Sequence, residues 1–522
     1  ISIIKLKYLV YITLSLIAFN AQGQRKNLPL NHELNYAIQH GLLSKDSSAH
    51  TSIRPYIEGK WGINEVRNVQ VDSGLYYYDF TQKLFKEHLV LIQGDDYRLT
   101  VDPLGNFRMG RDISDSLRIM VRNTRAIRVQ GDLGSNFSFE TFFYENQAKM
   151  PRYIGEYASR TGTLPGEGRV KNVGSEVLDF GYAMGYISYS PMENWNFQVG
   201  YGKQFIGNGY RSMLLSDFAF NYPYVRTTYN FGQGKFQYAS TFAQLSSLTR
   251  LPAATTPEAT YKRKLGNFHY LSFKPFSKLE LGVFEGAVFK QYEDTVGTVP
   301  AHFSAYSPIL GSSLIANGFE SENNVLLGLN ILYRIFKKTQ LYGQLVLDNP
   351  EEQKMGWQAG VKAFDCFGMT NLYLQLEVNS ANPYTYAVSD NNLIQNWSHM
   401  SAPLAHPYGA SFHEFVGIAY YEKEKIFGQL KTSSGVIRSI GNGYQNDINF
   451  PDQYAGVSEP EFKTIYNNVQ ELTFGYKFNV KTNLTGFISV RNRVRAEKVG
   501  VVNSTFISFG MRTNLNNLYY DF

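Results

Sequence analysis

The sequence predicts an all-β fold: a transmembrane antiparallel β-barrel of about 18 strands (16–18) with a small N-terminal periplasmic element. Three observations predict it. From about residue 97 onward, segments of roughly ten residues alternate between apolar and polar side chains. Short and long connections between these segments alternate along the chain. Charged residues make up only 18% of the chain, whereas aromatic residues make up 15%.

The composition favours such a barrel over a bundle of membrane helices. The 522 residues include 38 Tyr and 37 Phe, and the mean hydropathy is −0.28. A helical membrane protein would have a strongly positive value, whereas every second residue of a barrel strand can face water. The net charge of +6 is small for this length, and no basic block carries interleaved aromatic residues. No nucleic-acid partner is therefore expected.

The first 23 residues have the pattern of an export signal. Two lysines precede an apolar run from Tyr8 to Phe19, and Ala21 and Gly23 supply small residues before a cleavage site. A buried N-terminal helix is the alternative. The run is too short to span a membrane as a helix, and no later segment has about 20 consecutive apolar residues. We therefore expect three parts, which are a signal peptide (1–23), a periplasmic N-terminal element (24–95) and an outer-membrane β-barrel (96–522).

The N-terminal element is predicted to contain one short helix. Asn31 can cap a helix that runs to about Leu43. The apolar face of this helix would consist of Leu34, Ala37, Ile38 and Leu42. Two later stretches, Leu75–Phe80 and Leu84–Ile92, are aromatic or apolar and can form either strand or helix.

The remainder of the chain alternates in polarity with a period of two. In one segment, Leu372, Leu374, Leu376 and Val378 interleave with Tyr373, Gln375, Glu377 and Asn379. Because successive side chains of a strand point to opposite faces, one face is wholly apolar and the other carries charges and amides. Lipid outside a barrel and a polar lumen inside it require this division.

The connections are sorted by length, as in outer-membrane barrels with tight periplasmic turns and long external loops. The predicted short turns lie near Pro191–Asn194, Gly232–Gly234, Phe276–Lys278, Lys337–Lys338, Phe367–Gly368, Lys423–Lys425 and Val480–Thr482. The predicted long loops lie near 146–175, 204–221, 247–265, 292–324, 380–412 and 436–468, with shorter ones near 349–355 and 494–503. An even strand number returns both ends of the array to the periplasm.

The last residues, Asn517–Phe522, alternate aromatic side chains before a final Phe. This pattern resembles the signal that the barrel-assembly machinery reads on the last strand of an outer-membrane barrel. The machinery is therefore an expected partner during biogenesis, and outer-membrane lipid is the expected surroundings of the folded barrel.

No sequence motif indicates catalysis, a metal or a cofactor. HExxH, GxSxG, Walker and EF-hand patterns are all missing, and the spacing of seven between His399, His406 and His413 does not define a metal site. We therefore expect no enzyme activity, no metal and no cofactor. A carboxylate pair assembled across the lumen would be needed for glycoside chemistry, and the sequence leaves this alternative open.

Two features are candidates for ligand binding. Arg491, Arg493 and Arg495 share one strand face, which is opposite Ile488 and Val490 and therefore points to the lumen or the rim. They could attract uronate or phosphate sugars, or they could simply pair with lumen carboxylates such as Asp132 and Glu377.

The second feature is the glycine-rich stretch Gly200–Asp217, which contains Tyr210 and Arg211. It runs from the top of a strand into an external loop. Folded inward, the loop could offer stacking and charge to a sugar, or it could serve as a structural plug. The residues alone do not separate these two interpretations.

The same stretch, GYGKQFIGNGYRSMLLSD, resembles the characteristic segment of Wzi-like capsule assembly barrels and of RemB-type gliding-motility proteins of bacteroidetes. His50–Tyr56, Phe142–Ala148 and Tyr519–Phe522 resemble segments of the second group. The resemblance implies a monomeric 18-stranded barrel with a small periplasmic N-terminal element. It implies a non-enzymatic surface lectin for the capsule relatives and a surface component of motility for the gliding relatives. The short N-terminal helix departs from the fuller helical bundle of the capsule group.

The sequence thus predicts a non-enzymatic barrel that attaches or assembles surface polysaccharide. The alternatives are a component of gliding or surface-adhesin machinery with protein partners, and a diffusion porin whose constriction is the arginine ladder. The candidate polysaccharide-binding residues are Tyr210, Arg211, Arg491, Arg493 and Arg495.

Overall fold

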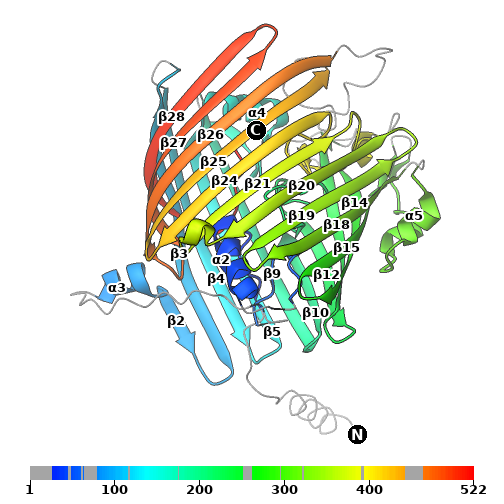
Figure 1. Cartoon of the computed structure of the whole chain (residues 1–522), viewed down its shortest axis with the longest axis horizontal. Coiled ribbons are helices and arrows are strands. Elements are labelled where there is room, and N and C mark those ends of the chain that lie inside the picture. Colours follow the sequence, from blue (N-terminus) through cyan, green and yellow to red (C-terminus); the bar gives the residue numbers. More distant parts are fainter. Residues whose placement is uncertain are drawn as a thin grey trace.

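A computed structural model places most of the chain in one closed antiparallel barrel (Figure 1). It describes residues 26–44, 47, 49–59, 63, 79–115, 118–173, 176–250, 261–293, 296–319, 323–388, 393–440 and 462–522. The predicted signal peptide lies outside these residues, and the predicted three-part division of the chain stays a prediction.

The wall of the barrel has 18 strands, as predicted, and β28 pairs with β3 to close it. In chain order the wall strands are β3 (Tyr97–Asp112), β4 (Arg118–Leu133), β5 (Phe137–Lys149), β9 (Val177–Met192), β10 (Trp195–Gly202), β12 (Tyr222–Phe231), β13 (Phe236–Arg250), β14 (Tyr261–Phe276), β15 (Leu279–Lys290), β18 (Asn324–Phe336), β19 (Thr339–Asn349), β20 (Lys354–Phe364), β21 (Leu372–Ala381), β24 (Phe412–Lys423), β25 (Ile426–Ile440), β26 (Phe462–Asn479), β27 (Leu484–Glu497) and β28 (Gly500–Thr513).

The remaining elements are short. β2 (Val90–Gln93) extends the wall beside β3, and β8 (Lys171–Val173) pairs with β9. The helices are α2 (His32–Ser44), α3 (Asp79–Lys86), α4 (Arg152–Thr161) and α5 (Ser312–Asn317), with 3₁₀ turns η1 (Phe303–Tyr306), η2 (Cys366–Gly368) and η3 (Leu393–Gln395). Short strand pairs form from β1 (Ile53–Arg54) with β11 (Phe205–Ile206), β6 (Thr163–Leu164) with β7 (Gly168–Arg169), β16 (Tyr292–Glu293) with β17 (Gly297–Thr298), and β22 (Ser398–His399) with β23 (Ala402–Pro403). Among the described helices, none combines the length and the apolar character needed to cross a bilayer.

The predicted alternation of faces is confirmed in the wall. On β21, Gln375 and Glu377 are buried in the lumen, whereas Leu376 and Val378 are 51% and 39% exposed on the outside. An apolar outer surface that faces lipid and a polar inner surface are the arrangement that a transmembrane barrel requires. The predicted short turns agree with the strand ends, but the loop predicted near 494–503 is a tight turn between Glu497 of β27 and Gly500 of β28. Residues 251–260 and 441–461 of two predicted long loops lie outside the described residues.

The lumen is packed with side chains and contains the largest cluster of buried apolar residues in the described chain. Four of the segments that enter it are residues 26–44 with 49–59, the loop 203–221 after β10, the loop 396–411 before β24, and residues 514–522 after β28. We call these four segments together the plug.

The predicted N-terminal helix is present as α2, and Asn31 caps it through a hydrogen bond from Leu34 N to its Oδ1 (3.0 Å). Ile38 and Leu42 are buried as predicted, but Ala37 is exposed and the prediction was wrong for this residue. The ring of Tyr36 stacks on Tyr373 of β21 with centroids 3.9 Å apart. The helix therefore lies against the inner surface of the wall, where Figure 1 shows it at the barrel mouth.

The end of the chain differs from the prediction. Residues 514–522 form no strand, because β28 ends at Thr513 and the following residues turn into the lumen. Tyr519, Tyr520 and Phe522 resemble a signal of the last strand, but in the structure they lie beyond that strand. Their aromatic rings pack in the plug instead, and Asp521 between them is fully buried. The barrel-assembly machinery remains a predicted partner.

Candidate functional site

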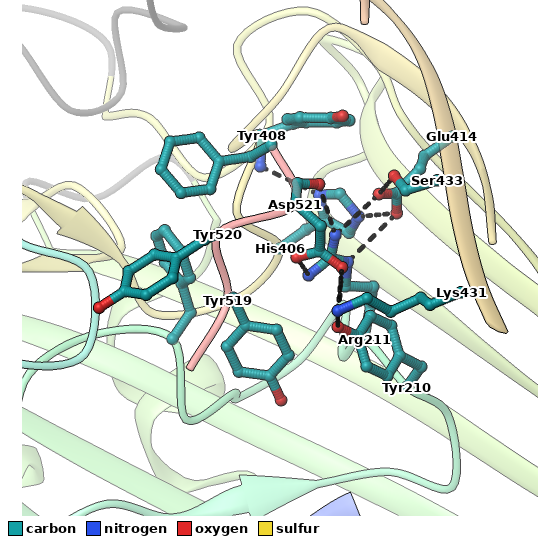
Figure 2. A network of polar contacts seen from close by, with 12 residues as sticks. Tyr210, Arg211, His406, Tyr408, Glu414, Lys431, Ser433, Tyr519, Tyr520 and Asp521 are labelled. Atoms are coloured by element: carbon teal, nitrogen blue, oxygen red, sulfur yellow. Dashed lines mark hydrogen bonds and ion pairs between the residues drawn. The ribbon is translucent and has the colours of Figure 1, made fainter. Parts of the chain in front are cut away.

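The centre of the plug is an ion-pair network around Arg211 (Figure 2). The guanidinium of Arg211 lies 3.0 Å from a carboxylate oxygen of Glu414 and 3.2 Å from one of Asp521. All three side chains are no more than 1% exposed. This network joins the loop after β10, the wall strand β24 and the end of the described chain.

Further donors surround the buried carboxylate of Asp521. Tyr210 donates its hydroxyl at 2.7 Å and Lys431 of β25 lies 3.3 Å away. Burial alone would raise the pKa of Asp521, but Arg211 and Lys431 hold it well below its usual range. Burial opposes the charge of Arg211 as well, yet Asp521 and Glu414 raise the pKa of its guanidinium. Both groups are therefore charged, and each depends on the other.

The backbone of the Tyr210–Arg211 turn is held by a second carboxylate. Glu377 of β21 accepts hydrogen bonds from Tyr210 N (2.7 Å) and Arg211 N (3.0 Å). Glu377 was predicted as a partner for the arginine ladder, and this pairing was wrong because its oxygens are taken by these amides. A Cβ at the preceding Gly209 would meet Glu377 at 2.5 Å, so glycine is required for this close approach.

His406 packs beside the network as a neutral ring. Its Nδ1 accepts from Tyr408 N (3.1 Å), so the proton is on Nε2, which donates to Glu414 (2.6 Å). Burial, assisted by Arg211, lowers the pKa of His406 against the opposing pull of Glu414. The second proton of an imidazolium would displace the Tyr408 amide.

This geometry predicts that the free energy of unfolding decreases in mild acid. His406 binds fewer protons in the folded state than in the unfolded state, so stability is lost as the pH falls below the unfolded value of about 6.5, by up to about 1.4 kcal/mol per pH unit. Urea unfolding in detergent micelles, followed by tryptophan fluorescence at pH 7.5 and 5.5, should show this slope. His406→Gln, which retains a donor for Glu414, should reduce it. The exposed control His413→Gln should leave the slope unchanged, and an equal slope in His406→Gln would contradict the prediction.

The arginine ladder faces the lumen, and its members have partners inside the barrel. Arg491 forms two hydrogen bonds of 2.9 Å to the carboxylate of Glu471 on the neighbouring strand β26. Arg495 pairs with Glu497 at 2.7 Å. Arg493 donates to Phe522 O (3.2 Å), and its guanidinium lies 4.3 Å from the ring centroid of Tyr153. Arg493 therefore helps to hold the plug, whereas Arg491 and Arg495 form ion pairs with wall carboxylates other than Asp132 and Glu377.

A cavity of about 170 Å³ lies between the plug and the wall formed by β3, β4 and β25–β28. Its lining includes four arginines and several aromatic rings, together with Glu33, Glu167 and Glu471. Arg108 and Arg512 lie 5.7 Å and 4.8 Å from the ring centroid of Phe487, and Tyr210 and Arg491 also contribute to the lining. The cavity thus offers stacking surfaces beside positive charge.

Several lining groups retain unused hydrogen-bonding capacity. Among the described residues, Glu33 Oε2, Tyr36 OH and the Nε atoms of Arg491 and Arg512 have no hydrogen-bond partner. Arg108 hydrogen-bonds only to Ser508 Oγ, at 3.0 and 2.8 Å, and no carboxylate oxygen of the described chain is within ion-pair distance of it. A buried polar group without a partner is costly, so these groups could bind a polar ligand.

The structure thus brings together only part of the predicted site. Tyr210 and Arg491 line the cavity, Arg211 and Arg493 form contacts within the plug, and Arg495 pairs with Glu497 on the wall. Sequence reasoning missed Arg108 and Arg512. The signal was present, since each stands next to apolar residues in an alternating segment and so falls on a lumen face.

No family model and no curated protein matches the chain. Among solved structures, the chain is similar to Wzi of Escherichia coli, an outer membrane protein involved in group 1 capsule assembly and a carbohydrate-binding β-barrel. The TM-score is 0.56 and the sequence identity is 12%, and the match covers 94% of this chain and 100% of Wzi. The chain is also similar to OprD of Pseudomonas aeruginosa, with a TM-score of 0.42 and 8% identity over 79% and 94%. OccAB2 of Acinetobacter baumannii has a TM-score of 0.42 and 12% identity over 80% and 98%. The similarity to Wzi shows the fold, which is that of an outer-membrane barrel.

Proposed function

We propose that this protein is a non-enzymatic barrel that attaches or assembles surface polysaccharide, in the manner of Wzi-like capsule proteins. The observation that carries the proposal is the lumen cavity, where Arg108 and Arg512 flank the ring of Phe487. An aromatic face beside guanidinium groups suits a sugar that bears a carboxylate or a phosphate.

The predicted site residues divide into two roles in this proposal. Tyr210 and Arg491 contact the ligand from the cavity wall, together with Arg108 and Arg512. Arg211 and Arg493 act through other residues, because they hold plug segments that shape the cavity, and Arg495 pairs with Glu497 of the same wall strand. The filled lumen favours binding over diffusion, since a porin needs a continuous aqueous path.

Binding of small acidic sugars tests the proposal. Isothermal titration of the detergent-solubilised barrel with glucuronate, glucose 1-phosphate and glucose should give binding of the two anions and none of glucose. Arg108→Gln should weaken binding about tenfold or more, because a charge-assisted hydrogen bond contributes about 1.5–3 kcal/mol.

Arg152→Gln is a suitable control, because Arg152 pairs with Asp115 at an exposed site of the helix α4 outside the cavity. It should bind both anions as the unchanged protein does. If glucose bound as tightly as the anions, or if Arg108→Gln bound the anions as tightly as the unchanged protein, the cavity would not be the binding site for acidic sugars.

The second candidate function is a role in gliding or surface-adhesin machinery, as the resemblance of His50–Tyr56 and Phe142–Ala148 to RemB-type proteins suggests. A deletion strain separates the two. Loss of surface polysaccharide with normal spreading supports the first function. Intact polysaccharide with lost spreading supports the second.

A further inference from the structure

The long loop between β15 and β18 packs against the outer surface of the barrel. Its described part, Val296–Phe319, contains η1 and α5, and we call it the outer flap. Figure 1 shows α5 outside the wall, beside β15 and β18. This placement differs from that of the loops 203–221 and 396–411, which enter the lumen.

The wall beneath the outer flap is polar where a barrel wall should be apolar. Asn267, His269 and Glu285 occupy outward positions of β14 and β15, in phase with Leu281, which is 38% exposed. Each of the three polar residues is nonetheless at most 1% exposed. The outer flap therefore covers them.

Hydrogen bonds attach the outer flap to these wall residues. The carboxylate of Glu285 accepts from Gly311 N and Leu314 N, at 2.7 Å each, at the start of α5. Asn267 Nδ2 donates to Ser307 O (3.1 Å). The outer flap thus supplies partners for Glu285 and for Asn267 Nδ2, whereas Asn267 Oδ1 and His269 Nε2 are buried without a hydrogen-bond partner among the described residues.

The opposite face of the outer flap is apolar and uncovered. Phe303, Ile309 and Ile315 are 77%, 66% and 89% exposed. The sequence has no Asp, Glu, Lys or Arg from Val296 to Phe319. An external loop in water would not combine a contiguous apolar face with the loss of all charge.

The outer flap extends along the membrane-spanning part of the wall, where contact with lipid is expected. Tyr238, near the start of β13 and close to a short turn, donates its hydroxyl to Pro308 O (2.5 Å). The neighbouring strand β18 contacts α5, and its outward residues Leu329 and Ile331 are 47% and 45% exposed. The apolar face of the outer flap therefore continues the lipid-facing surface of the barrel.

We infer that the outer flap lies in the hydrocarbon layer of the outer membrane. Its inner face shields Asn267, His269 and Glu285 from lipid, and its outer face contacts acyl chains. A charged side chain on a lipid-facing wall is unfavourable, and the outer flap removes that cost by supplying hydrogen-bond partners. This inference is independent of what the lumen cavity binds.

Spin-label accessibility tests the inference in the full chain. Single cysteines replace Phe303 or Ile315 in a Cys366→Ser background, since Cys366 is the sole native cysteine. The labelled protein is reconstituted into dioleoylphosphatidylcholine vesicles, and collision with oxygen is compared with collision with a water-soluble nickel chelate. Leu329→Cys serves as the lipid-facing control, and Val499→Cys, at a 91% exposed turn residue, serves as the aqueous control.

The labels at Phe303 and Ile315 should match Leu329, with an oxygen-to-nickel ratio several-fold above that of Val499. A ratio like that of Val499 would place the outer flap in water and overturn the inference. Low accessibility to both reagents would also overturn it, because a protein partner or a second copy would then cover this face. All four positions are exposed, so the substitutions leave the packed interior intact.

Discussion

Replacing Arg211 with Met is expected to lower the free energy of unfolding by about 3–5 kcal/mol, the cost of leaving a buried charge without its partner. Arg211 forms ion pairs with both Glu414 and Asp521 at the centre of the plug, and all three side chains are buried. Urea unfolding in detergent micelles measures the loss. Arg211→Lys should rescue it only partly, because one ammonium cannot reproduce the planar fork that reaches both carboxylates.

Two comparisons make the Arg211 experiment specific. Arg152→Met breaks an ion pair of 2.6 Å at a side chain that is 58% exposed, and it should cost less than about 1 kcal/mol. Combining Arg211→Met with Asp521→Asn should cost less than the sum of the two single changes, because both act on one interaction. Full additivity would show that Arg211 and Asp521 do not stabilise the plug through each other.

Replacing Glu280 with Ala is expected to release the N-terminal segment from the wall. The carboxylate of Glu280, on β15, accepts from the amides of Thr51 and Ser52 and from both their hydroxyls. The residue is 1% exposed, so the two amides and the Ser52 hydroxyl would lose this buried acceptor, at about 1–3 kcal/mol each, whereas the Thr51 hydroxyl retains Asn208 Oδ1 (3.0 Å). Hydrogen exchange of the peptide 49–57 should accelerate on the order of 100-fold or more, since each 1.4 kcal/mol is tenfold.

The matched control for Glu280 is Glu176→Ala. Glu176 also accepts from more than one cation, Arg118 and Lys149, but it lies in an external loop with a side chain that is 44% exposed. Exchange of the peptide 49–57 should not change in this variant. Unchanged exchange in Glu280→Ala as well would mean that Lys274, which donates to Ala49 O (2.7 Å), holds the segment without help from Glu280.

The barrel wall could be predicted from the sequence because the alternation of apolar and polar residues is visible within each strand. Alternation along each strand decides which side chain meets lipid, and Leu376 and Glu377 illustrate the rule with opposite exposures. The faces of Arg491, Arg493 and Arg495 followed from the same rule. Their carboxylate partners required the strand register, and Glu471 faces Arg491 only through the pairing of β26 with β27.

The plug was not predictable because its contacts join distant residues. Arg211 and Asp521 are 310 positions apart, and nothing local to either indicates the other. The segment Tyr519–Phe522 shows the limit most clearly. Its aromatic pattern suits a strand, but Asp217 accepts from the Tyr519 hydroxyl (2.7 Å) inside the lumen, and tertiary contact outweighs local preference.

Ion conductance in planar lipid bilayers tests most directly whether the chain's own segments close the barrel. The purified protein should add no steady conductance, because the residues around Arg211 and Trp397 fill the lumen. Glu280→Ala should add transient openings as the N-terminal segment is released. A stable, long-lived open channel in the unchanged protein would contradict the closed lumen and favour a diffusion porin.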